Sequence, residues 1–258
     1  MALGRSDMND NMNKEFCSQL RDQGFMVGTF VKFTDPAVIE ILASFKIDFI
    51  VIDAEHAPLG RQQVSNLLMA ATASRLPAIV RVPEGNKLWI STALDAGAAG
   101  VMVPHVSTVD EAERLVRLMK FGVAGRGFSP STRAAGFGTR GIAKHLVMQP
   151  DETSLICQIE DRIGVENAGD IAAVDGVDCL FVGPVDLAVS LGHTDVKDPD
   201  VVNQCEQVVR SSAHSNTAAG MYLSSIADAR AWREIGVSIA VIGTDQAFIR
   251  SGAGTSLG

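Results

Sequence analysis

Short apolar runs separated by segments with helical periodicity recur along the whole chain, and this alternation restricts the fold more than any other feature. The runs predicted to be strands lie near residues 26–31, 48–54, 77–82, 100–105, 154–159, 179–183, 218–223 and 238–243. They are rich in Val, Ile and Phe, as strands buried on both faces are. Strands that alternate with helices form a parallel sheet, and 258 residues are close to the roughly 250 of one eight-stranded barrel. The sequence therefore predicts a single α/β domain, a (β/α)8 TIM barrel.

The predicted helices have recognisable ends. Thr108 and Glu111 form a capping box before an apolar stripe of helical spacing. Gly236 follows another helical pattern, at the position where glycine commonly ends a helix. A short N-terminal helix over Lys14–Asp22 precedes the first strand, and we expect it to close the bottom of the barrel.

The barrel domain is predicted to span residues 13–250, between a disordered N-terminal segment, 1–12, and a flexible C-terminal tail, 251–258. The tail reads SGAGTSLG, a composition that disfavours helix. Residues 121–141 read FGVAGRGFSPSTRAAGFGTRG and contain no apolar run long enough for a ninth strand. They are predicted to form a long loop that extends to about residue 150, and loops of that length are usually functional or mobile.

Composition excludes several classes of protein. The chain is 47% hydrophobic, so it is able to bury a large core. Its net charge is -8 and no basic cluster is present, which argues against nucleic acid as a partner. No apolar run reaches the roughly 20 residues of a membrane span, and the N-terminus lacks an apolar signal core, so we expect a cytoplasmic protein without a membrane partner. The cysteines have no metal-ligand spacing and are expected to be buried and reduced: Cys17, Cys157, Cys179 and Cys205.

Polar side chains lie at or shortly after the carboxyl ends of five predicted strands, at nearly constant spacing. They are His56, Arg81, His105, Glu160 and Asp186, which are separated by 25, 24, 55 and 26 residues. The third step is longer because it contains the glycine-rich loop at 121–141. The carboxyl ends of barrel strands converge on one face, and active sites of such barrels lie there. We therefore expect these side chains to meet.

Glu160 and Asp186 close neighbouring strands and should lie side by side. A carboxylate pair with open coordination positions suits a hard divalent cation, Mg²⁺ or Mn²⁺. The alternative is a structural ion pair with Arg81 or Arg162. His105 is either a third ligand or, as we expect, a hydrogen-bonded core histidine.

The remaining polar residues admit more than one interpretation. His56, in IDAEHAPLG, is a candidate general base because its ordinary pKa lies near neutrality, or it caps a helix. Arg81 lies in an otherwise apolar strand and must find an anion, either Glu160 or a substrate carboxylate. Asp95, in LDAGAAG, is interpreted as a solvated residue at a helix end. The turn that opens GPVDLAVSLG has free N–H groups able to hold a carboxylate.

Six motifs in this order resemble the HpcH/HpaI aldolase family, the class II metal-dependent pyruvate aldolases (4-hydroxy-2-oxo-acid aldolases). They are FIVIDAEHAP, VRVP, LDAG, MVPHV, QIED and GPVDLAVSLG, and the match covers roughly residues 14–250. The resemblance implies a carbon–carbon lyase that acts on small-molecule 2-oxo acids and aldehydes. It also implies a homo-oligomer, a trimer or a hexamer.

The resemblance assigns roles to residues that spacing left ambiguous. It implies that His56 is the catalytic base, that Asp95 raises the basicity of this histidine, and that Arg81 polarises the keto oxygen. It implies that Glu160 and Asp186 bind a divalent metal ion, Mg²⁺, Mn²⁺ or Co²⁺.

Contacts with the pyruvate unit are implied for the residues around the last two motifs: Gln158, Gly183, Pro184, Val185 and Asp186. Relatives often carry tryptophan on the first strand near the site, where this chain has Phe30. Phe30 is therefore expected to form an apolar wall of the substrate pocket without the indole donor.

The expected reaction is reversible retro-aldol cleavage of a 4-hydroxy-2-oxo acid, of the 2-dehydro-3-deoxy sugar acid or 4-hydroxy-2-oxo-dioate type, to pyruvate and an aldehyde. Alternatives are decarboxylation of oxaloacetate and a CoA-ester lyase reaction of the citrate-lyase β type. A different class is a non-catalytic barrel used for binding or assembly. No lysine lies at the five strand ends that carry His56, Arg81, His105, Glu160 and Asp186, so a metal mechanism is favoured over a Schiff base.

Overall fold

Eight parallel strands form a closed barrel in the described part of the chain. The computed structural model describes residues 5–215 and 217–258, with side chains from residue 12 onward. The strands are β1 (Met26–Val31), β2 (Phe49–Asp53), β3 (Ala78–Arg81), β4 (Gly100–Val103), β5 (Ser154–Ile159), β6 (Cys179–Val182), β7 (Ala218–Leu223) and β8 (Ile239–Thr244). Each strand pairs with its sequence neighbours, and β8 pairs with β1. The predicted (β/α)8 barrel is confirmed.

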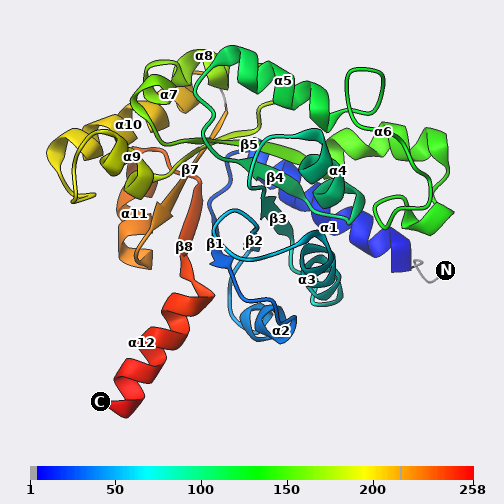
Figure 1. Ribbon diagram of the computed structural model, residues 1–258, viewed down its shortest axis with the longest axis horizontal. Coiled ribbons are helices and arrows are strands. Elements are labelled where there is room, and N and C mark those ends of the chain that lie inside the picture. Colours follow the sequence, from blue (N-terminus) through cyan, green and yellow to red (C-terminus); the bar gives the residue numbers. More distant parts are fainter. Residues whose placement is uncertain (1–4, 216) are drawn as a thin grey trace.

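Helices surround the barrel (Figure 1). They are α1 (Arg5–Arg21), α2 (Ala37–Ala43), α3 (Arg61–Ala73), α4 (Lys87–Asp95), α5 (Val109–Met119), α6 (Ile142–Glu152), α7 (Arg162–Glu166), α8 (Ala168–Ala172), α9 (Pro184–Ser190), α10 (Pro199–His214), α11 (Ile226–Ile235) and α12 (Asp245–Leu257), with a 3-10 turn, η1 (Gly136–Gly138). None of the described helices is long and apolar enough to cross a membrane.

Helix ends follow the chemistry of the sequence. Thr108 and Glu111 form the predicted capping box at the start of α5. Ser225 caps α11 by accepting a hydrogen bond from the backbone N–H of Asp228, and Gly236 ends this helix with a φ of 127°. A side chain other than glycine would be strained in that conformation, so a glycine is required there.

The N-terminal helix α1 closes the barrel, as expected. Phe16, Cys17 and Leu20 are buried and join the cluster of apolar side chains inside the barrel. The ring centroid of Phe16 lies 5.5 Å from that of Phe49 on β2. We expected residues 1–12 to be disordered, but the helix begins at Arg5 and includes residues 5–12. Residues 1–4 lie outside the described chain.

The long loop after α5 is shorter than predicted. Residues 142–150 were expected to continue the loop, but they belong to α6. The many glycines before them and Pro150 within them obscured the helical pattern. Tertiary contacts hold this segment: Arg21 of α1 donates hydrogen bonds to the carbonyl oxygens of Pro150 and Thr153, each at 2.9 Å.

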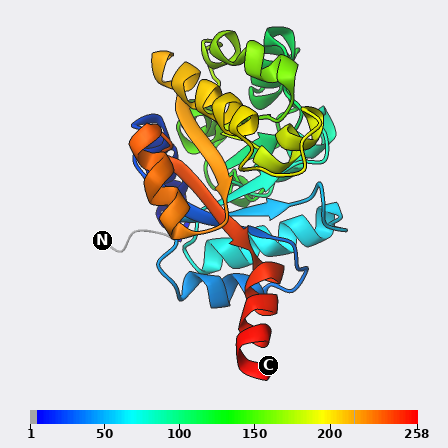
Figure 2. The ribbon, with the colours of Figure 1, turned by 90° about the vertical axis from the view of Figure 1, so that its left-hand side faces the viewer.

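The C-terminus is helical, although residues 251–258 were expected to form a non-helical, flexible tail. The Thr244 side chain accepts a hydrogen bond from the backbone N–H of Ala247, and this cap starts α12. Once a helix is nucleated, each further residue adds a hydrogen bond at low cost, so the glycine-rich end can follow. Figures 1 and 2 show α12 extending away from the barrel, and its Phe248 and Ile249 are exposed.

Two apolar clusters stabilise the fold, one between the strands and the surrounding helices and one inside the barrel. All four cysteines are buried and unpaired, as predicted. Burial raises the pKa of the Cys17 thiol to about 12, so this side chain stays protonated.

Candidate active site

Asp53 organises the turn that follows β2. Its Oδ1 accepts hydrogen bonds from the backbone N–H groups of Glu55, at 3.2 Å, and His56, at 3.1 Å. Its side chain is fully buried, and Lys32 Nζ lies 3.2 Å from its Oδ2. Burial alone would raise the pKa of Asp53. The hydrogen bonds and positive charge of Arg81, the backbone hydrogen bond from His56 and the charge of Lys32 outweigh burial, so the pKa is lowered. Asp53 is therefore held as a carboxylate that positions both neighbours.

Arg81 faces Asp53 across the β2–β3 pair, where the two residues are register partners. Arg81 Nε donates to Asp53 Oδ1 at 3.0 Å, and Nη2 donates to Oδ2 at 2.8 Å. Glu55 Oε2 lies 3.3 Å from Arg81 Nε. The sequence alternative of a pair between Arg81 and Glu160 is therefore wrong. Arg81 Nη1 has no hydrogen bond to a described residue, so one edge of a fixed guanidinium is left to donate to a ligand.

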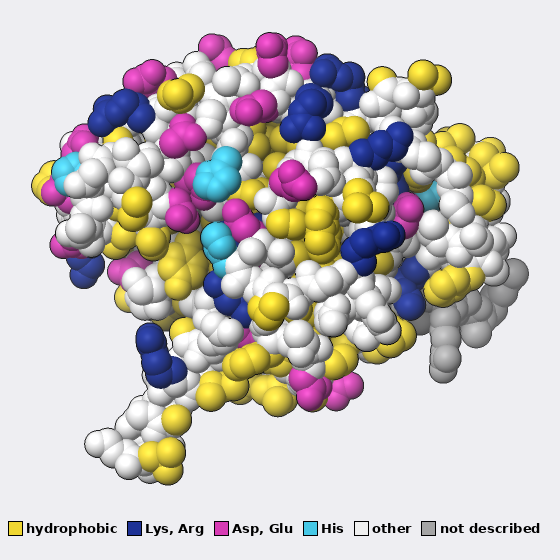
Figure 3. Space-filling model, in the orientation of Figure 1, with side chains coloured by type: hydrophobic (Ala, Val, Ile, Leu, Met, Phe, Trp, Pro, Cys, Tyr) yellow, Lys and Arg dark blue, Asp and Glu magenta, His cyan; other side chains and the backbone are white. Residues whose placement is uncertain are grey.

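Glu55 lies between two exposed histidines. Its Oε2 is 3.7 Å from His56 Nε2, and its Oε1 is 3.7 Å from His105 Nε2. Burial raises the pKa of Glu55, although the charges of Arg81, His56 and His105 oppose this. On the face shown in Figure 3, two histidine side chains lie beside acidic side chains near the centre of the molecule. An exposed imidazole backed by a buried carboxylate is suited to accept a proton from a bound molecule.

His105 is not the core histidine that we expected. Its side chain is 66% exposed, and its φ is 54°. This left-handed conformation is uncommon for a residue other than glycine. It lets the His105 backbone N–H donate to Glu160 Oε1 at 2.9 Å, while its Nδ1 lies 2.8 Å from the same oxygen. Strain of this kind is often found at functional sites.

Glu160 and Asp186 lie close enough to affect each other, as predicted from their strand ends. The Glu160 side chain is 2% exposed, whereas Asp186 is exposed in the first turn of α9. Burial raises the pKa of Glu160; His105 opposes this by its charge and hydrogen bond, and the negative charge of Asp186 adds to the increase. A positive ion beside the pair would remove this conflict.

Gln158 adds a third oxygen to this part of the site. Its Nε2 donates a short hydrogen bond to Glu160 Oε2, and its Oε1 is buried without a hydrogen-bond partner. A Cβ atom on Gly183 would lie 2.9 Å from Glu160 Oε2, so the glycine keeps the space beside this oxygen open. The described residues contain no set of three or more His, Cys, Asp or Glu side chains arranged around a metal ion. Two carboxylates and an amide oxygen fit a divalent cation that keeps water or substrate as its other ligands.

The start of α9 borders this group. Pro184 occupies the first turn of the helix, and Val185 is 51% exposed. Pro184 and Val185 directly precede Asp186, and Gly183 lies beside Glu160 Oε2. The backbone at 183–185 therefore adjoins the carboxylate pair.

Asp95 lies away from this cluster. It ends α4, which runs from the carboxyl end of β3 back toward the amino end of β4. Arg126 Nη1 donates to Asp95 Oδ1 at 2.7 Å, and no hydrogen bond or ion pair joins Asp95 to His56 among the described residues of this chain. The structure therefore does not bring together the pair that the resemblance implied, and Asp95 is not the free, solvated residue that its motif alone suggested.

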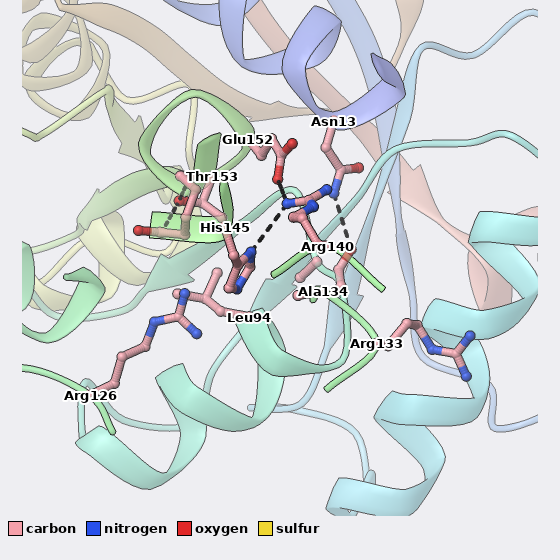
Figure 4. A pocket seen from close by; sticks show the side chains of 12 residues that line it. Asn13, Leu94, Arg126, Arg133, Ala134, Arg140, His145, Glu152 and Thr153 are labelled. Atoms are coloured by element: carbon pink, nitrogen blue, oxygen red, sulfur yellow. Dashed lines mark hydrogen bonds and ion pairs between the residues drawn. The ribbon is translucent and has the colours of Figure 1, made fainter. Parts of the chain in front are cut away.

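A polar cavity adjoins Arg126 at this side of the barrel (Figure 4). It lies between α1, α4 and α6, and Arg140 contacts both His145 and Glu152 there. Burial, with the charges of Arg140 and Arg126, lowers the pKa of His145 to about 4. His145 is thus neutral near pH 7, and this cluster is separate from the strand-end site.

Two aromatic residues form one wall of the strand-end site. Phe30 of β1 is 4% exposed, and the guanidinium carbon of Arg81 lies 4.5 Å from the centre of its ring. The ring centroid of Tyr222, on β7, lies 6.1 Å from that of Phe30. Phe30 is therefore placed beside the polar cluster, in agreement with its expected position.

Sequence reasoning assigned no role to Asp53, Glu55 or Tyr222. The two carboxylates were visible in the IDAEH motif, next to the histidine that was chosen. Their importance depends on the β2–β3 register, which brings Arg81 opposite Asp53. Tyr222 carried one available signal, because it is a polar aromatic residue near the end of an apolar strand.

Comparisons with known proteins show similarity over most of the chain. The sequence profile of the HpcH/HpaI aldolase/citrate lyase family matches residues 26–251. The chain is 36% identical over 236 residues to a hydroxypyruvate/pyruvate aldolase of Paraburkholderia phytofirmans, covering 88% of this chain and 90% of that protein. It is 35% identical over 246 residues to a 5-keto-4-deoxy-D-glucarate aldolase of Escherichia coli, covering 94% and 95%. A crystal structure of a family protein from Burkholderia cenocepacia superimposes with a TM-score of 0.89 at 35% identity, over 95% of this chain and 98% of that one.

Proposed function

The chain belongs to the HpcH/HpaI aldolase/citrate lyase family of carbon–carbon lyases, and we propose that it cleaves a 4-hydroxy-2-oxo acid reversibly to pyruvate and an aldehyde. The observation that carries this proposal is one cluster at the strand ends, which joins a carboxylate pair, a fixed arginine and a histidine backed by a carboxylate. Relatives named for hydroxypyruvate/pyruvate and 5-keto-4-deoxy-D-glucarate support a substrate of the sugar-acid type.

The proposal includes a divalent cation, Mg²⁺, Mn²⁺ or Co²⁺, held by Glu160 and Asp186. The raised pKa of Glu160 and the unpartnered Oε1 of Gln158 support a cation at this place. When bound, the cation would supply Lewis-acid polarisation of the carboxylate and keto oxygens of a 2-oxo acid. Gln158, Gly183, Pro184 and Val185 then border the pyruvate half of the substrate.

Arg81 acts on the keto oxygen in this mechanism. Asp53 holds the guanidinium in a bidentate pair, so its free Nη1 edge is presented in one orientation. Negative charge develops on the keto oxygen as the bond between C3 and C4 breaks. A preorganised donor at this oxygen stabilises that charge without reorientation of solvent.

His56 moves the proton of the C4 hydroxyl. Its side chain is 52% exposed, so a substrate is able to reach it. Taking this proton lets the C4 oxygen become the aldehyde carbonyl while the C3–C4 bond breaks. Glu55, 3.7 Å from His56 Nε2, stabilises the protonated imidazole. We therefore assign to Glu55 the charge-balancing role that the resemblance had placed on Asp95.

The same proposal extends to assembly. The exposed Phe248 and Ile249 of α12 support a homo-oligomer, a trimer or a hexamer, because apolar side chains on a projecting helix favour burial against another chain. Light scattering of the purified protein measures this directly, and a monomer at micromolar concentration would contradict it.

Pyruvate release from a 4-hydroxy-2-oxo acid tests the reaction. We expect release to stop after treatment with a chelator and to return with Mg²⁺, Mn²⁺ or Co²⁺. Glu160→Gln should abolish both release and metal binding measured by calorimetry. Glu166→Gln, at an exposed carboxylate on α7, is the matched control and should change neither. Full activity with chelator, or trapping of pyruvate on a lysine by borohydride, would overturn the proposal.

A further inference from the structure

Tyr222 is the only tyrosine of the chain, and it lies at the mouth of the barrel. It is the fifth residue of β7, a six-residue strand, and it is half-buried against the apolar cluster inside the barrel. Its ring packs on Phe30, and Phe30 in turn lies under the Arg81 guanidinium. Tyr222 is thus one side chain removed from the arginine assigned to the keto oxygen.

Tyr222 also adjoins the start of α9. It shares a space of about 160 Å³ with Pro184, and this space runs along the helical side of β7 to Cys205 of α10 and Trp232 of α11. The contact that places Tyr222 beside the strand-end site is therefore its ring packing on Phe30 inside the barrel.

The phenolic hydroxyl of Tyr222 has no hydrogen bond to any described residue. It is not one of the buried side-chain atoms that lack a partner, so solvent or a bound molecule is able to reach it. The neighbouring Phe30 carries no donor. The wall formed by Phe30 and Tyr222 thus contains one polar atom that the protein itself leaves available.

We propose that Tyr222 recognises the aldehyde half of the substrate by donating its hydroxyl hydrogen to an oxygen next to the reacting carbonyl. This inference rests on the proposed aldolase function. The oxygens of the pyruvate half already have partners in Arg81 and in the carboxylate pair with its cation. A hydroxyl on the aldehyde has no other donor on this aromatic wall, so the preferred aldehydes are α-hydroxyaldehydes.

Tyr222→Phe tests this assignment because it removes one oxygen and keeps the ring that packs on Phe30. The variant and the parent protein are compared in aldol addition of pyruvate to glycolaldehyde and to propionaldehyde, which have equal numbers of non-hydrogen atoms. We expect kcat/KM for glycolaldehyde to fall about tenfold, the usual effect of one neutral hydrogen bond. The value for propionaldehyde should fall much less, so the ratio of the two kcat/KM values reports the lost hydrogen bond.

Equal losses with both aldehydes would mean that Tyr222 acts only through packing, and no loss would mean that its hydroxyl touches no substrate. Either result overturns the proposal.

A binding measurement separates this proposal from the aldolase function. Oxalate has the paired oxygens of a 2-oxo acid but no methyl group, so its complex with the metal-loaded enzyme does not react. Adding glycolaldehyde to this complex should perturb the near-ultraviolet absorption of the single phenol, and propionaldehyde should not. If the enzyme shows no aldol activity but still gives this response, only the proposed aldolase function is contradicted. Absence of the response with glycolaldehyde would refute the role of Tyr222.

Discussion

Replacing Asp53 by Asn should destabilise the fold and disable the site together. The carboxylate accepts two hydrogen bonds from Arg81, at 2.8 and 3.0 Å, and its side chain is fully buried while that of Arg81 is 7% exposed. Asn keeps the shape but removes the charge and places an N–H₂ group opposite a guanidinium. Breaking a buried ion pair typically costs about 3–5 kcal/mol. Glu55 remains 3.3 Å from Arg81 Nε as a second anion, so we expect the low end, about 3 kcal/mol.

Urea unfolding of the parent, Asp53→Asn, Arg81→Gln and the double variant measures this cost and the coupling between the two residues. The coupling energy should be about 2 kcal/mol, because residues in direct contact are not additive. Asp175→Asn, at an exposed carboxylate, is the matched control and should change stability by less than about 0.5 kcal/mol. A loss below about 1 kcal/mol for Asp53→Asn, with no coupling, would refute the reasoning.

The pH dependence of this difference follows from the lowered pKa of Asp53. The carboxylate has its ordinary pKa, roughly 3.9, in the unfolded chain and a lower one in the folded protein. Its contribution to stability is therefore full above the unfolded value and is lost as pH falls through the folded value. The advantage of the parent over Asp53→Asn should be constant near neutrality and shrink only in strong acid.

Three further variants separate the parts of the site. His56→Ala should slow aldol cleavage by about 10²–10⁴-fold and oxaloacetate decarboxylation much less, because decarboxylation removes no hydroxyl proton; intact cleavage would exclude His56 as the base. Gly183→Ala should weaken metal binding in calorimetry while the fold persists, because its Cβ would lie 2.9 Å from Glu160 Oε2 and its φ of -97° suits any residue; unchanged affinity would show that this space is not used. Phe30→Ala should alter the preference among aldehydes and leave decarboxylation nearly unchanged, and equal loss of both activities would contradict its place in the aldehyde wall.

Local patterns in the sequence were sufficient to predict the barrel. The alternation of apolar runs and helical stripes placed all eight strands within a few residues of their observed bounds. The capping box at Thr108 and the glycine at 236 depend only on neighbours in the chain, and both formed as expected. The convergence of Glu160 with Asp186, and of His56 with Arg81, followed because the carboxyl ends of parallel strands must meet on one face.

Tertiary structure decided the partners of these side chains. Arg81 pairs with Asp53 and not with Glu160, because the register of β2 against β3 makes them direct neighbours. His105 is exposed because its left-handed backbone turns toward Glu160, and a single φ angle cannot be deduced from an apolar run. Asp95 pairs with Arg126 of the long loop, far along the chain. Sequence spacing determines which strand end a residue occupies, whereas hydrogen-bond partners depend on register, backbone conformation and long-range packing, which only the folded chain contains.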